Sequence, residues 1–74
     1  MAPEQDEYIN YPEEQEIANL PEVTDEMIDE YDQRWQDALE QFGDGSPEEI
    51  KAFRLGKRLR YHAMYLDRVR AQNV

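Results

Sequence analysis

The side chains of this chain that could do chemistry are its carboxylates, one histidine, one serine and one threonine. Nucleophilic catalysis needs a hydroxyl or thiol beside a base, and the chain has no cysteine. Thr24 and Ser46 each stand directly before a helical pattern, so a helix cap is the better explanation of both hydroxyls. His62 lies within a helical pattern, where we expect a partly buried core or interface histidine. These residues predict that the chain is not an enzyme and binds no cofactor.

Carboxylates at i,i+4 spacing could hold a hard cation. Asp25 with Asp29, and Glu26 with Glu30, have this spacing and would lie on one side of a helix. Calcium sites, however, take about six to eight oxygen ligands, usually from a loop that contains glycine. The segment Asp-Gly-Ser at 44–46 is too short for such a loop. We therefore expect a solvated acidic face and no metal site.

Eighteen acidic and eight basic side chains give a formal net charge of −10, and the charges are unevenly distributed. Residues 1–46 hold fifteen acids and one base, whereas residues 47–74 hold three acids and seven bases. Strong negative charge opposes non-specific binding to nucleic acids and membranes and favours basic partners. We expect a protein partner with a basic or mixed surface, and we do not expect direct binding of nucleic acid by the basic part.

The first 23 residues carry seven carboxylates and no apolar run, so we expect neither a signal peptide nor a membrane span. The predicted location is the cytoplasm, or a virion if the protein is viral. Residues 1–23 are predicted to form a largely extended acidic arm, because Pro3, Pro12 and Pro21 each disfavour helix in the preceding residue. Pro12 can open a short helix that runs through Asn19.

Residues 24–74 are predicted to form an all-α, two-helix antiparallel hairpin, with helices over about 24–42 and 46–72. Thr24 is a good N-cap for the first helix, and Gly43 is a good stop residue for it. The segment Ser-Pro-Glu-Glu at 46–49 is a capping box with proline at the first helical position. The domain organisation is therefore an arm, 1–23, followed by a hairpin, 24–74.

With the turn at 43–45, facing positions of the two helices sum to about 92. Trp35 then faces Gly56, and we expect this pair at the centre of the core. The second helix has two apolar stripes, which indicates two neighbours. The main stripe is Ala52, Leu55, Leu59, Ala63, Leu66 and Val69, and the second consists of Ile50, Phe53, Tyr61 and Met64. One neighbour is the first helix, and the other is the arm, another subunit or a partner. The register sets Phe42 near Ile50 and Leu39 near Phe53.

The second helix outruns the first by about 12 Å, at about 1.5 Å per residue, so its end is expected to overhang without cover. In one interpretation, glutamates of the arm fold back and pair with Arg68 and Arg70. In the other, which we favour, arm and overhang together form one site for a partner, because surface ion pairs of about 0–1 kcal/mol could hardly order twenty residues. The predicted partner-binding residues are Tyr8, Ile9, Tyr11, Glu13, Glu14, Glu16, Tyr65, Arg68, Val69 and Arg70.

The alternative function is mimicry of nucleic acid, in which an acidic face occupies the basic groove of a DNA- or RNA-binding protein. The first helix would present carboxylates at a spacing similar to that of phosphates along a single strand. The residues of this alternative face are Asp25, Glu26, Asp29, Glu30, Asp32, Asp37 and Glu40.

In composition, the chain is similar to small acidic helical proteins of phages and mobile elements, including virion accessory subunits and inhibitors of host nucleases. The likeness rests on size, acidity and helical pattern, and no sequence motif carries it. We therefore expect a protein-binding accessory subunit or adaptor of a larger assembly, with a phage virion as one such assembly and a homo-oligomer left open.

Overall fold

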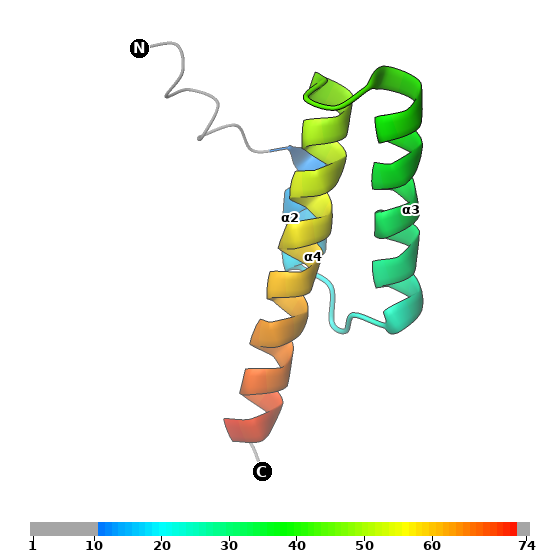
Figure 1. The fold of residues 1–74 in the computed structure, drawn as a ribbon. Coiled ribbons are helices and arrows are strands. Elements are labelled where there is room, and N and C mark those ends of the chain that lie inside the picture. Colours follow the sequence, from blue (N-terminus) through cyan, green and yellow to red (C-terminus); the bar gives the residue numbers. More distant parts are fainter. Residues whose placement is uncertain (1–10, 73–74) are drawn as a thin grey trace.

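The structure is a computed structural model, and it describes residues 11–72. This part of the chain contains three helices and no strand: α2 (Pro12–Ala18), α3 (Asp25–Phe42) and α4 (Pro47–Gln72). Figure 1 shows α3 and α4 side by side and antiparallel, with α2 against another side of α4. The end of α4 extends beyond the start of α3 (Figure 1). The all-α hairpin and its short N-terminal helix are confirmed.

The helix ends follow from local chemistry that the sequence predicts. The Oγ1 atom of Thr24 accepts a hydrogen bond of 3.2 Å from the backbone N–H of Met27, which satisfies one of the free donors at the start of α3. Gly43 ends α3 with φ at 92°, and Gly45 has φ at 83°. Residues other than glycine rarely adopt such positive φ angles. The two glycines therefore allow the backbone to reverse direction within a few residues.

The capping box at the start of α4 also joins the two long helices. The Oγ atom of Ser46 accepts from the backbone N–H of Glu49 at 3.1 Å. The carboxylate of Glu49 is buried, and it accepts from the N–H of Gly45 at 3.0 Å and from the indole Nε1 of Trp35 at 2.5 Å. One carboxylate therefore holds the turn and a side chain of α3 together.

The register of the hairpin agrees with the prediction, whereas the centre of the core does not. An ion pair of 2.6 Å joins Asp32 to Arg60, two positions that sum to 92. Trp35 is only half-buried, and its ring centroid is 6.1 Å from that of Phe53. A Cβ atom on Gly56 would meet only the guanidinium of Arg60, at 3.8 Å. The expectation that Trp35 and Gly56 form the centre of the core was wrong.

The core lies instead where α2 and the first half of α3 both pack against α4. Its buried side chains are Ile17, Leu55 and Leu59, which are 1 %, 6 % and 0 % exposed. Ile17 reaches this position because Pro12 opens α2 and directs one helical face towards α4. Tyr11, which the sequence left without a core position, packs against this cluster. The other partly buried side chains around the cluster are Leu20, Val23, Met27, Ile28 and Tyr31.

Within the part that the structure describes, no helix is long and apolar enough to cross a membrane.

Candidate protein-interaction surface

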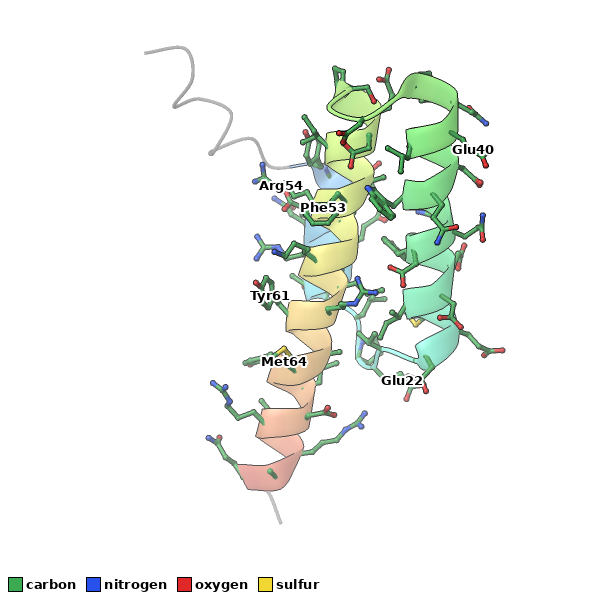
Figure 2. All side chains as sticks on the ribbon, viewed as in Figure 1. Glu22, Glu40, Phe53, Arg54, Tyr61 and Met64 are labelled. Atoms are coloured by element: carbon green, nitrogen blue, oxygen red, sulfur yellow. The ribbon has the colours of Figure 1, made fainter. Side chains whose placement is uncertain are left out.

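Three sides of α4 differ in what covers them. One side packs against α3 and a second packs against α2. A third is largely exposed, although Phe53 at its edge lies near the ring of Trp35 in α3. Four large apolar side chains project from the third side, and we call them the open strip. They are Ile50, Phe53, Tyr61 and Met64, with exposed fractions of 51 %, 49 %, 58 % and 58 %. Figure 2 shows Tyr61 and Met64 on the side of α4 turned away from α3.

The open strip runs almost parallel to the axis of α4. Tyr61 follows Ile50 by eleven residues, and Met64 follows Phe53 by the same interval. Because eleven residues make about three full turns, the four side chains return to the same face and do not wind around the helix. From Ile50 to Met64 the strip is about 21 Å long at about 1.5 Å per residue. Another helix could lie along it.

A single lysine interrupts the apolar surface in the middle of the strip. The Nζ atom of Lys57 lies 5.5 Å from the ring centroid of Phe53, within the range of a cation–π contact. Among residues 11–72, no carboxylate lies within ion-pair distance of Lys57. A cavity of about 390 Å³ opens beside it, lined by Glu14, Phe53, Arg54, Lys57, Arg58 and Tyr61.

Four other bases of α4, namely Lys51, Arg54, Arg58 and Arg60, form ion pairs with carboxylates of the chain itself. Glu14 is 4 % exposed, and its Oε2 atom lies 3.3 Å from Nε of Arg54 and 3.6 Å from Nε of Arg58. Its Oε1 atom accepts from the backbone N–H of Tyr11 at 3.1 Å. A carboxylate so nearly buried needs this number of partners, because an unpaired buried charge is costly. Glu14 is thus part of the structure that fastens α2 to α4.

Glu13 also forms an ion pair with a base of α4. Its Oε2 atom lies 3.2 Å from Nζ of Lys51. A hydrogen bond from its own backbone N–H, and then the hydrogen bond from Lys51, lower the pKa of Glu13 below its ordinary value of 4.5. The same ammonium lies 5.1 Å from the ring centroid of Tyr11, and the guanidinium of Arg54 lies 5.6 Å from it.

These contacts correct the interpretation of the arm. In the interpretation in which the arm folds back, Glu13, Glu14 or Glu16 was expected to pair with Arg68 and Arg70. Instead Glu13 and Glu14 pair with Lys51, Arg54 and Arg58 in the first half of α4. The reason is that Ile17 packs into the core beside Leu55 and Leu59, which aligns α2 with that half. The binding of a partner by Tyr11, Glu13 and Glu14 stays a prediction. Glu16 is exposed, and Tyr8 and Ile9 lie outside the described residues.

The overhang at the end of α4 is partly covered. Tyr65 is 60 % exposed, and its ring stacks on that of His62 with centroids 6.0 Å apart. The Nε2 atom of His62 lies 2.9 Å from the carbonyl oxygen of Leu20. Arg68 is exposed and Val69 is half-buried. An exposed Arg70 lines a cavity of about 270 Å³, with Val23, Asp25, Ile28, Ala63, Leu66 and Asp67.

The alternative acidic face on α3 is largely solvated. Asp32 pairs with Arg60, and Glu30 pairs with Arg34 at 3.3 Å. Asp37 accepts a hydrogen bond of 3.1 Å from Nε2 of Gln33. The members of the face that are exposed and without an ion pair among residues 11–72 are Asp25, Glu26, Asp29, Asp37 and Glu40. No three acidic or histidine side chains of the described residues form a group that could hold a metal ion.

Sequence reasoning found the four apolar members of the open strip, but it did not single out Lys57. A signal was present: from Lys51 to Leu66 the sequence has five bases and no acid. Which of these bases lacks a partner depends on contacts with α2 and α3, and those contacts join residues far apart in the sequence.

Searches of protein-family models, of curated proteins and of solved structures found no significant match to this chain.

Proposed function

We propose that this protein is a small accessory subunit or adaptor that binds a protein partner through the open strip of α4. The observation that supports the proposal is the exposure of four large apolar side chains on one face of a helix whose other two faces are covered. Several large apolar side chains that stay exposed on one face of a small domain are typical of an interaction site. Aromatic and methionine side chains are also enriched at such interfaces.

A comparison of three forms of the full chain tests the proposal. Each form is immobilised and exposed to a lysate of the source organism, and the retained proteins are identified by mass spectrometry. The first form is the wild type, the second carries Tyr61→Ser with Met64→Ser in the strip, and the third carries Tyr65→Ala with Val69→Ser in the overhang. We expect a protein retained by the first and third forms and lost from the second.

The overhang form serves as the matched control, because it also removes an exposed tyrosine and an aliphatic side chain from α4. Helical content and melting temperature of each form are measured by circular dichroism. If the partner is lost from the overhang form and kept by the strip form, binding belongs to the end of α4 and the proposal is wrong.

Mimicry of nucleic acid is the second candidate, and the solvated carboxylates of α3 favour it. Screening by salt weakens exposed charge pairs, and the Debye length falls to about 3 Å at 1 M salt. A partner held by the α3 face should therefore dissociate steeply as salt is raised and should ignore the strip substitutions. A partner held by the apolar strip should stay bound as salt is raised and should be lost when the strip is substituted.

A further inference from the structure

We infer that the element covering the open strip is an amphipathic helix of the partner, with carboxylates beside its apolar face. The inference rests on the proposed function and adds the chemistry of the partner. It follows from the geometry of the strip and from the charge of Lys57 and its neighbours.

The shape of the strip favours a helix. Its side chains recur at intervals of three and eleven residues along α4, and Lys57 lies four residues from both Phe53 and Tyr61. Such spacing makes ridges that interlock with the ridges of a second helix. Binding by strand addition needs an exposed strand edge, and residues 11–72 contain no strand. The length of about 21 Å corresponds to about fourteen residues of a partner helix.

The charge around the strip favours an acidic partner. Lys57 has no ion-pair partner in the described part of the chain, although it stands between Phe53 and Tyr61 on the surface to be covered. Among the described residues that line the cavity beside it, Glu14 is the one carboxylate, and its side chain pairs with Arg54 and Arg58, not with Lys57. Covering Lys57 with apolar groups alone would desolvate an unpaired charge, which is unfavourable.

The net charge of −10 does not cancel the preference of the surface around Lys57 for an acidic partner. The Debye length is about 8 Å at physiological salt, so carboxylates farther away across the surface are largely screened. Charges within the contact decide which partner is accepted.

A second copy of this chain fits the strip less well than an acidic helix does. Two α4 helices packed through their strips would bring Lys57 towards the bases of the other copy, since α4 has no acid between Lys51 and Leu66. Like charges across an interface are destabilising.

The test uses three synthetic peptides of about eighteen residues, long enough to span the strip. All three share one helical face of leucine and alanine and carry glutamate, glutamine or lysine at the positions that flank it. Binding to the full chain is measured by fluorescence anisotropy at about 0.15 M salt. We expect the glutamate peptide to bind about tenfold more tightly than the lysine peptide, from a few exposed charge pairs, and the glutamine peptide to lie between them.

Lys57→Glu should reverse this order of affinity. The matched control is Arg34→Glu on α3, which changes the net charge by the same amount at an exposed base outside the strip and should leave the order unchanged. Tyr61→Ser with Met64→Ser should weaken all three peptides together. Melting temperatures of all variants establish that each is folded.

Equal binding of the three peptides, or an order that Lys57→Glu leaves unchanged, would overturn the inference. So would binding that appears only after residues 1–10 are removed, or a wild-type dimer that Tyr61→Ser dissociates, because the chain itself would then cover the strip. The proposed function fails on a different result: in the lysate experiment, the partner stays bound to the strip form.

Discussion

Two faces of α4 carry the same kinds of side chain, but one face is buried and its bases are paired, whereas the other is exposed. On the face covered by α2 and α3, Leu55 and Leu59 are buried, and beside them Arg54 and Arg58 share Glu14. On the open strip, Phe53 and Tyr61 are about half exposed, and Lys57 has no ion-pair partner among residues 11–72. The difference teaches that residue type alone does not separate core from binding surface in a short helical chain. What separates them is whether the chain supplies a covering element.

The largest expected contrast between the faces is in stability. Leu59→Ala removes a fully buried side chain and should lower the free energy of unfolding by about 2–5 kcal/mol. Met64→Ala, on the open strip of the same helix, should change it by no more than about 0.5 kcal/mol. Urea denaturation followed by circular dichroism measures both. Similar losses for the two variants would mean that the strip is as buried as the core.

The second largest expected loss of unfolding free energy comes from the ion pairs between α2 and α4. Glu14→Gln removes the charge that two arginines share and should cost about 1–3 kcal/mol, the usual range for losing charged hydrogen bonds in a buried place. Glu16→Gln is the control, because it makes the same change at an exposed position of the same helix. If both substitutions have the same effect on the urea midpoint, the Glu14 contacts do not stabilise the docking of α2.

The smallest expected effect concerns the pH dependence of Glu13. Because its pKa is lowered in the folded state, Glu13 stabilises the fold above pH 4.5, and this contribution is lost as the pH falls through the lowered pKa. An NMR titration should give a midpoint below 4.5. Lys51→Gln should raise that midpoint part of the way, since the hydrogen bond from the backbone N–H of Glu13 remains.

Lys57→Gln serves as the control for this titration. It removes an equal charge from α4 at a position that has no carboxylate partner in the described part, so the midpoint of Glu13 should not move. A midpoint that shifts equally in both variants would show that the general charge of α4, and not the contact with Lys51, lowers the pKa.

Local chemistry explains which features the sequence could predict. Thr24, Gly43 and the capping box at 46–49 act on neighbours within a few residues, so they indicated both long helices and the turn. The second stripe of α4 followed in the same way from helical spacing. Each of these signals is complete within a short window of sequence.

The burial of Ile17 and Glu14 could not be predicted from a short window of sequence. Ile17 is an isolated apolar residue in a glutamate-rich segment, so it makes no periodic pattern. The partner of Glu14, Arg54, lies forty residues away, and several bases of α4 were equally plausible as partners. Trp35 was assigned to the centre of the core because the hairpin register sets it opposite Gly56, whereas its indole N–H donates to Glu49 near the start of α4.

The separation between contacting residues also sets an order of assembly. Trp35 and Glu49 are 14 residues apart, Asp32 and Arg60 are 28 apart, and Leu20 and His62 are 42 apart. Each doubling of the loop adds about 0.6 kcal/mol to the entropic cost of closing it. The contacts between α3 and α4 should therefore form first near the turn and then farther from it, and α2 should pack against α4 last. During synthesis, α2 leaves the ribosome well before the residues that will receive it, so the core can close only after Leu55 and Leu59 have also emerged.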